Sequence, residues 1–475
     1  MLKKILFDSF IYAILPKITM VFSLFLMPIT TKYLTEFDYG VWGIIAAYSG
    51  LLAGLRELGT SVVLANSFYK HPKGFKLIWR NLLAFYYVWG IVYGLTFGVL
   101  LCFIIPVEAE HNKWLIIALM LIPDLLFTPI ISIGSRFYQL SRKPLPVTII
   151  SIIVGCIGIL ISFTGIVYYK LGYMAWIIAT ATPSILSGLV YFYLFVIKKG
   201  FMPIFRFNRS TYRRYLKISL PMVPHKYASF ILNSSDRVIL DVYSIPSGNI
   251  GRYNFAYNYG NYTGSLASGL AKGVRPFFYK ILSRDIGSTE GLLQFRRVTF
   301  LIQGATLLFC FLVSLWLKEA FYILVNNYEL RNMYSLAIVC VMSYSMNTMY
   351  QNVSITLNFN QRTAELSKVS FTAAIINLVL NLSLIPIFGY WIAAVTTLFS
   401  VAYLSFGGML KKNYRECQPL NNYVLYWFFA VLILTSGAFC LADAHVFIKS
   451  IISVSFILFG VFLYFKFFKG RISYV

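Results

Sequence analysis

Apolar runs of about 20 residues, the length of helix that crosses a bilayer core of about 30 Å, recur from one end of the chain to the other. The loops between them are short, and no segment is left for a sizeable soluble domain. Hydrophobic residues make up 59% of the sequence and charged residues 12%, against roughly 25% charged residues in soluble domains. These features predict an all-α polytopic membrane protein.

The apolar pattern predicts about fourteen transmembrane helices. The first run follows Lys3 and Lys4 without a small-residue cleavage site, so we interpret it as a retained helix rather than a signal peptide. Twelve spans remain if the last pair lies at the membrane interface. The predicted spans are residues 9–33, 40–66, 80–105, 114–138, 145–169, 172–197, 216–243, 251–278, 298–325, 333–359, 365–388, 390–410, 421–441 and 446–468.

Basic residues are distributed in a way that indicates topology. The chain has 41 Lys and Arg against 16 Asp and Glu, a net charge of +25. Successive loops alternate between a set rich in Lys and Arg and a set that holds few of them. By the positive-inside rule this alternation places both termini in the cytoplasm. It also explains the excess charge without a nucleic-acid partner.

The two halves of the chain resemble each other. LGYMAWIIAT at 171–180 is similar to FGYWIAAVTT at 388–397, and Asp38-Tyr39-Gly40 corresponds to Asn249-Ile250-Gly251. Six spans per half predict a parallel repeat with a substrate site between the halves. The predicted organisation is a lobe at 1–199, a basic cytoplasmic linker at 200–215 that lies on anionic headgroups, a second lobe at 216–412 and an extra helix pair with a basic tail at 413–475.

Polar side chains form one face on two predicted spans. The stripes are Tyr253, Tyr257, Asn261, Ser268, Lys272 and Arg275 on span 251–278, and Asn347, Tyr350, Gln351 and Asn358 on span 333–359. Amide and tyrosine groups supply the hydrogen bonds and stacking surfaces that sugars need. We therefore predict that the uncharged members of both stripes bind a glycan. Hydrogen bonding between helices is the alternative.

Four cations lie within predicted spans, where each charge costs at least roughly 2.5–3.5 kcal/mol at mid-bilayer. They are Lys17, Arg56, Lys272 and Arg275, and a diphosphate in a common cavity would satisfy them. Lys17 and Lys272 could instead reach the cytoplasmic surface along their flexible stems. Arg56 cannot easily do so and is the strongest candidate.

Three carboxylates in the spans are candidates for carrying a coupling ion: Glu57, Asp124 and Asp236. No enzyme signature accompanies them. The four histidines are dispersed, no phosphate-binding glycine loop is present, and the six cysteines show no metal or redox spacing. We expect no catalytic residue, metal or cofactor.

The chain resembles the oligosaccharide flippases of bacterial polysaccharide biosynthesis (Wzx-like), within the multidrug/oligosaccharidyl-lipid/polysaccharide exporter superfamily. The resemblance covers most of the chain. It is carried by ITTKYLTEFDYGVWGIIAAYSGLL at 29–52, by LPMVPHKYASFILNSSDRVIL at 220–240 and by the Gly251-Arg252-Tyr253 entry to the next span. Lys17, Arg56 and Arg275 are similar in placement to cavity cations of the lipid II flippase branch.

The resemblance implies two six-helix lobes around a cavity that opens alternately to either side of a bacterial inner membrane. It implies an undecaprenyl-diphosphate-linked glycan as substrate, for O-antigen or capsule, with antiport of H⁺ or Na⁺ or use of the membrane potential. The polysaccharide polymerase machinery is an expected partner. The alternatives are a multidrug antiporter or a peptidoglycan-precursor flippase of the same fold and, from another class, a membrane glycosyltransferase or polymerase.

Overall fold

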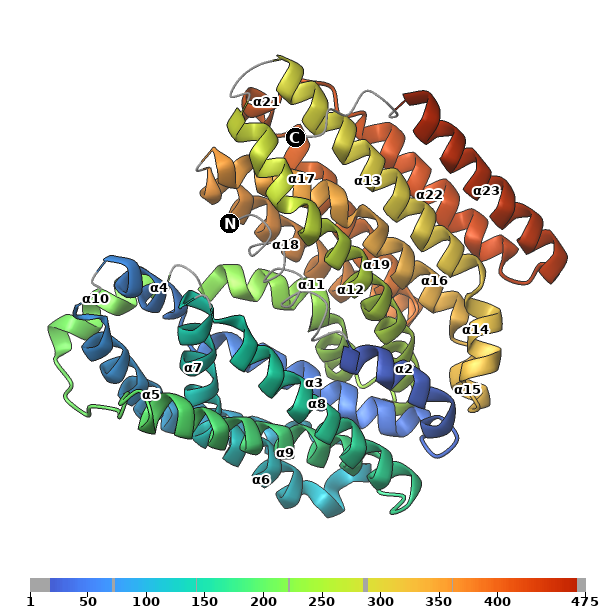
Figure 1. Ribbon diagram of the computed structural model, residues 1–475. Coiled ribbons are helices and arrows are strands. Elements are labelled where there is room, and N and C mark those ends of the chain that lie inside the picture. Colours follow the sequence, from blue (N-terminus) through green and yellow to red (C-terminus); the bar gives the residue numbers. More distant parts are fainter. Residues whose placement is uncertain are drawn as a thin grey trace. The chain divides into compact units, whose positions relative to one another are not determined.

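The computed structural model describes residues 18–70, 73–141, 143–220, 223–284, 289–360 and 362–467. Every regular element within these ranges is a helix (Figure 1). The chain divides into two compact units, Met1–Phe230 with Pro246–Gly251 and Ile231–Ile245 with Arg252–Val475. Two helices, α11 (Val223–Val242) and α12 (Ser247–Arg284), contribute residues to both units. The assignment of residues 200–215 as a linker between two six-helix lobes remains a prediction.

The first unit is a bundle in which α8 packs along α9, α5 along α6, and α2 against α8 (Figure 1). Aromatic rings around the fully buried Trp79 fill one end of it, including Phe195 and Phe201, whose rings stack 4.3 Å apart. The helices are α2 (Ile18–Thr30), α3 (Glu36–Arg56), α4 (Ser61–Lys70), α5 (Phe75–Ile104), η2 (Val107–Asn112), α6 (Lys113–Leu126), α7 (Thr128–Leu140), α8 (Pro144–Val167), α9 (Tyr173–Tyr191), η3 (Phe192–Ile197) and α10 (Arg209–Ser219).

The start of α3 joins two of the sequence motifs. Thr35 caps the helix, and its backbone amide and hydroxyl both donate to the Asp38 carboxylate, at 2.9 and 2.8 Å. The other Asp38 oxygen accepts the amide of Tyr173, the first residue of α9, at 2.8 Å. Gly172 has a φ of 54°, and a Cβ there would lie 2.4 Å from Asp38 Oδ1. Gly172 and Tyr173, the Gly-Tyr pair of the repeat, therefore form the contact with the Asp38 carboxylate.

A pair of glycines brings α3 and the first turn of α12 into backbone contact. A Cβ at Gly251 would lie 1.7 Å from the Glu36 carbonyl oxygen and 2.7 Å from the Gly40 nitrogen. A Cβ at Gly40 would lie 2.0 Å from the Ser247 carbonyl oxygen. Gly40 and Gly251 hold equivalent positions in the sequence repeat. Only glycine permits so close an approach of two backbones.

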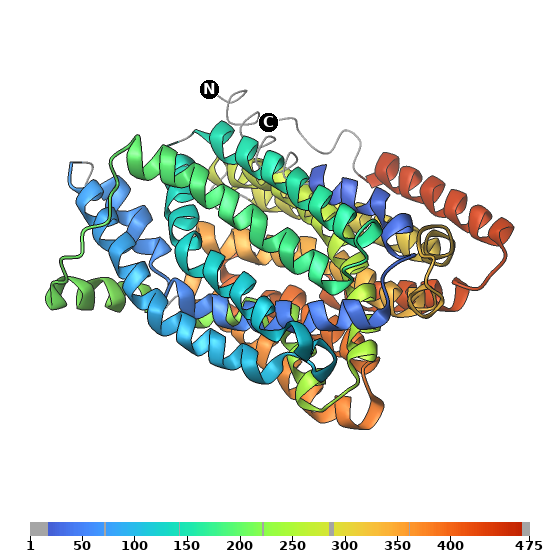
Figure 2. The ribbon, with the colours of Figure 1, turned by 90° about the horizontal axis from the view of Figure 1, so that it is seen from below.

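In the second unit, α22 and α23 both pack against α13, and α23 runs along the edge of this unit (Figures 1 and 2). The helices after α12 are α13 (Thr289–Leu315), α14 (Leu317–Leu324), α15 (Tyr328–Arg331), α16 (Tyr334–Ser343), η5 (Tyr344–Met346), α17 (Asn347–Phe359), α18 (Thr363–Phe388), α19 (Ile392–Ala402), η6 (Tyr403–Gly407), α20 (Gly408–Leu410), α21 (Lys412–Cys417), α22 (Val424–Leu441) and α23 (Val446–Phe467).

Eight of the described helices are long and apolar enough to cross a membrane, or ten if each of two bent pairs forms one span. The protein is thus a multi-pass membrane protein with eight to ten candidate spans, fewer than the fourteen predicted. The difference has three causes. Polar faces lower the mean hydropathy of α11 and α12, and the predicted span 333–359 is divided among α16, η5 and α17. Residues 9–17 of the first predicted span lie outside the described residues.

A buried ion pair anchors the start of α23. Lys449 is fully buried, and its ammonium donates to both Glu319 carboxylate oxygens at 2.7 and 2.9 Å and to the Ala442 carbonyl at 2.6 Å. Beside it, Lys318 bonds to Asp443 in the exposed turn between α22 and α23. This hydrogen bond lowers the pKa of Asp443 below its ordinary value.

We expect Lys449→Met to lower the free energy of unfolding by about 1.5–3 kcal/mol, because Glu319 loses a charged hydrogen-bond partner. The thermal melting of the detergent-solubilised protein measures this. Lys318→Ala breaks an exposed pair and should change stability by no more than about 1 kcal/mol. The double variant Lys449→Met/Glu319→Leu should recover most of the loss, since it leaves no unpaired charge. An equal loss in the single and double variants would contradict this account.

Candidate functional site

Two helices of the first unit are broken. α3 ends at Arg56, and the chain turns through Leu58 (φ 44°) and Gly59 (φ 70°) before α4 departs at 45°. α6 ends at Leu126, and only Phe127 separates it from α7, with a bend of 42°. Breaks at membrane depth are tolerated where they line protein or a water-filled cavity. In transporters, discontinuous helices commonly form the substrate and ion sites.

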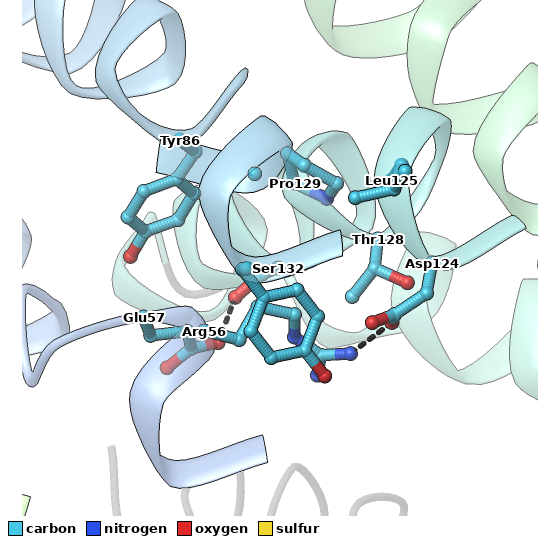
Figure 3. A pocket seen from close by; sticks show the side chains of 10 residues that line it. Arg56, Glu57, Tyr86, Asp124, Leu125, Thr128, Pro129 and Ser132 are labelled. Atoms are coloured by element: carbon cyan, nitrogen blue, oxygen red, sulfur yellow. Dashed lines mark hydrogen bonds and ion pairs between the residues drawn. The ribbon is translucent and has the colours of Figure 1, made fainter. Parts of the chain in front are cut away.

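An ion pair and a hydrogen bond tie the two breaks together (Figure 3). The Arg56 guanidinium pairs with the Asp124 carboxylate, and the Ser132 hydroxyl of α7 donates to Glu57. The Arg56 and Asp124 side chains are 29% and 15% exposed. Asp124 lies in the last turn of α6, where the negative end of the helix dipole disfavours a carboxylate. Arg56 supplies the compensating charge.

A cavity opens beside this pair. Its polar lining is Ser49, Arg56, Tyr93, Asp124, Thr128, Thr180 and Ser184. A neighbouring small pocket shares Arg56 and Asp124 and adds Glu57, Tyr86 and Ser132 (Figure 3). The hydroxyl groups match the hydrogen-bonding needs of a sugar, and the arginine–carboxylate pair could exchange a partner for a phosphate oxygen or a proton.

The structure thus brings together three residues that the sequence singled out separately: Arg56, Glu57 and Asp124. Within this cluster one cation faces two carboxylates. Arg56 is bound to a carboxylate in this structure, and its predicted role as a phosphate ligand stays a prediction. The contact with Asp124 is made through Nη1, one of the three guanidinium nitrogens.

Three aromatic residues of α5 that sequence reasoning missed complete this region. Trp89 donates from Nε1 to the Leu55 carbonyl at 2.9 Å, next to the end of α3. The Tyr86 hydroxyl bonds to Thr60 in the break, and Tyr93 lines the cavity. Their spacing of three and four residues puts them on one face of α5. That spacing was the available signal.

In the second unit a buried cluster surrounds Asp236 and Arg237 of α11. The Tyr253 hydroxyl donates to Asp236, whose carboxylate lies 3.9 Å from Arg237 Nη1. The Arg237 guanidinium lies 4.3 Å from the centre of the Tyr257 ring, a cation–π contact. Tyr253 and Tyr257 are 0% and 3% exposed. In this conformation both predicted glycan-binding tyrosines contact the ion pair and not solvent.

The other predicted glycan-binding residues divide into two groups. Asn261 accepts the Tyr344 hydroxyl at 2.5 Å, which is the helix-to-helix bonding that was the alternative reading. The four predicted residues on α17 are half-buried and share one face of the helix: Asn347, Tyr350, Gln351 and Asn358. The opposite face of α17 packs, with Asn352 donating to Thr299 at 2.9 Å. Among the described members of the two stripes, those on α17 are therefore more accessible than Tyr253 and Tyr257.

A ladder of buried polar groups in the second unit also escaped the sequence analysis. Asn377 and Asn381 lie one turn apart on α18 and bond to each other at 3.2 Å. Asn377 also accepts Ser235 of α11, and Thr396 of α19 donates to Asn381. Asn377, Asn381 and Thr396 are almost fully buried. Two amide side chains four residues apart in an apolar helix were the sequence signal for this ladder.

Several predicted residues cannot be placed. Lys17 lies outside the described residues, as do the side chains of Ser268, Lys272 and Arg275. Among the residues that the structure does describe, no group of three or more His, Cys, Asp or Glu side chains could hold a metal ion. The candidate site therefore consists of the Arg56–Asp124 cavity of the first unit.

The fold matches that of solved membrane transporters. It is similar to an inward-facing multidrug resistance MATE family transporter of the MOP superfamily, with 12% identity and a TM-score of 0.61 over 90% of this chain and 99% of the other. It is also similar to the lipid II flippase MurJ in an inward closed conformation (16% identity, TM-score 0.51, 94% and 96% covered). It is similar as well to the Vibrio cholerae MATE transporter VcmN, with 11% identity and a TM-score of 0.52 over 88% of this chain and 96% of the other. The chain therefore has the fold of the MOP superfamily.

The sequence narrows this class further. Residues 5–282, more than half of the chain, match the family described as Polysaccharide biosynthesis protein, and the protein belongs to that family. The resemblance drawn from its motifs is thereby confirmed at the level of family and superfamily fold. No curated protein sequence matches the chain significantly. The family match includes both broken helices and the Arg56–Asp124 cavity.

Proposed function

We propose that this protein is a flippase that moves a polyprenyl-diphosphate-linked oligosaccharide, a unit of O-antigen, capsule or a related polysaccharide, from the cytoplasmic to the outer leaflet by alternating access. The observation that carries the proposal is the hydroxyl-lined Arg56–Asp124 cavity in a chain of the polysaccharide biosynthesis family. Its substrate is the glycan on undecaprenyl diphosphate, and its work includes no bond-making chemistry.

Arg56 is the shared element of the proposed mechanism. Its planar guanidinium can bind either the Asp124 carboxylate or two phosphate oxygens, but not both at full strength. When diphosphate takes Arg56, Asp124 loses its counter-ion and is more readily neutralised by H⁺ or Na⁺. Substrate binding and ion uptake are then coupled at one pair of side chains. Glu57 and Asp236 remain further candidates for the coupling ion.

The remaining predicted residues have proposed roles of their own. Lys17, Lys272 and Arg275 add positive charge for the diphosphate, while sugars bind to the α17 face and, where the buried cluster opens, to the α12 tyrosines. The proposed topology has fourteen spans, as two six-helix lobes and an extra pair, in the bacterial inner membrane with both termini cytoplasmic. The polysaccharide polymerase machinery is the proposed downstream partner.

Reconstitution tests the proposal directly. Purified protein is placed in vesicles that contain a polyprenyl diphosphate carrying a fluorescent saccharide, and a membrane-impermeant quencher reports the leaflet. We expect the protein to accelerate exchange between leaflets above protein-free vesicles, and a H⁺ or Na⁺ gradient to change the rate. Wild-type protein that leaves exchange at the background rate would contradict the function.

A multidrug antiporter is the second candidate, because two carboxylates and two tyrosines beside one arginine could also hold an organic cation. The same vesicles distinguish the two functions. Gradient-driven accumulation of cationic dyes without saccharide exchange would favour the antiporter.

A further inference from the structure

The segment between α9 and α10 forms an ordered basic surface at one end of the first unit. We define the basic collar as its seven cations: Lys198, Lys199, Arg206, Arg209, Arg213, Arg214 and Lys217. All seven are exposed, and residues 198–217 contain no acidic residue. Among the described residues, none of the seven forms an ion pair with a carboxylate. Figures 1 and 2 show α10 beside α4 at this end of the unit.

The collar is held in place by its apolar and backbone groups. Phe201 is buried and stacks on Phe195, and the Met202 carbonyl accepts from Arg80 Nε at 2.7 Å. The Tyr212 ring stacks on Phe85 at 5.3 Å, and its hydroxyl donates to the Asn81 carbonyl at 2.9 Å. These contacts hold the backbone of the collar against the first unit.

The arrangement is unfavourable for the isolated protein. Arg209, Arg213 and Lys217 follow one another at four-residue spacing, so they share one face of α10, where like charges repel. The apolar side chains of Phe205 and Phe207 are 59% and 48% exposed beside Arg206. An anionic partner with an apolar interior would neutralise the repelling charges and would also cover the exposed rings of Phe205 and Phe207.

The position of the collar relative to two spans identifies that partner. Residues 198–217 follow directly after the candidate span that ends at Ile197. They contact Arg80 and Asn81, close to Phe75, where another candidate span begins. The collar therefore lies where hydrocarbon gives way to lipid headgroups. Basic and aromatic side chains together are typical of segments that bind anionic bilayer surfaces.

We propose that the basic collar is a binding surface for anionic phospholipid headgroups. The cations contact the phosphates, and Phe205 and Phe207 enter the region between headgroups and acyl chains. The surface does not depend on which substrate the protein transports. A glycerophospholipid such as phosphatidylglycerol supplies both the charge and the apolar depth that the collar presents.

Native mass spectrometry of the full chain in neutral detergent tests this, with phosphatidylglycerol and phosphatidylcholine added at equal concentration. Wild-type protein should retain phosphatidylglycerol preferentially. The variant Arg209→Gln/Arg213→Gln/Arg214→Gln should lose at least about tenfold in phosphatidylglycerol affinity, because it removes three cations that attract an anionic bilayer surface. The Lys triple variant at the same positions should keep the preference, which also shows that the helix still folds.

The matched control removes three exposed cations elsewhere, Lys411→Gln/Lys412→Gln/Arg415→Gln, and should keep the preference. Equal losses in the two Gln variants, or none in either, would overturn the proposal. So would a collar variant that loses affinity for added polyprenyl diphosphate but not for phosphatidylglycerol, because the collar would then be a substrate-capture surface.

Discussion

Arg56→Ala is expected to lower glycan exchange in reconstituted vesicles by about tenfold to a hundredfold, because a charged hydrogen bond worth about 1.5–3 kcal/mol disappears. The change removes the proposed phosphate ligand and leaves the Asp124 carboxylate without its ion-pair partner. The measurement is the initial rate of leaflet exchange at equal protein density. Lys368→Ala, which breaks the exposed pair with Glu365, is the control and should exchange at the wild-type rate.

The reversed pair Arg56→Asp/Asp124→Arg separates a transport role from a structural one. If the pair only holds the two helix breaks together, reversal restores attraction and should recover much of the activity. If Arg56 must also bind phosphate from the end of α3, the reversed protein should fold and remain slow. We expect the second outcome. Full activity of the reversed protein would show that Arg56 does not bind the phosphate of the substrate.

Gly251→Ala is expected to destabilise the protein by at least about 1–3 kcal/mol, the usual cost of overpacking. The new Cβ would lie 1.7 Å from the Glu36 carbonyl, a backbone atom that cannot rotate away. Gly40→Ala should have a similar effect, because its Cβ would meet the Ser247 carbonyl at 2.0 Å. Thermal melting in detergent and the yield of folded protein measure the loss.

Two further glycines serve as controls. A Cβ at Gly248, in the same turn of α12, would meet only the flexible Glu36 side chain at 3.3 Å, and one at Gly437 would meet nothing within 4 Å. Gly248→Ala should be tolerated. Gly437→Ala should stabilise α22 by about 0.5–1 kcal/mol, the helix-propensity gain. If all four variants have the same melting temperature, the backbone contact of α3 with α12 does not contribute specifically to stability.

The candidate site was only partly predictable. Arg56, Glu57 and Asp124 stood out because charges are costly inside apolar spans. Their association did not, since 68 residues separate Arg56 from Asp124. Tyr253, Tyr257 and Asn261 of the predicted stripe lie on α12, but their partners could not be predicted from the sequence. Tyr253 and Tyr257 are buried against Arg237, a contact that depends on how α11 and α12 pack.

The sequence alone determined the membrane class, the family, and the costly polar and charged positions, because hydropathy, charge bias and helical spacing are properties of neighbouring residues. It also marked Gly40 and Gly251 as equivalent. Only the tertiary structure showed that α3 and α6 break, that the breaks share one ion pair, and that the two glycines touch. Breaks depend on backbone angles such as the positive φ of Leu58, and pairing depends on distances between helices far apart in the chain. Neither can be derived from local composition, and the structure shows Arg56 as one half of an ion pair rather than as an isolated cation.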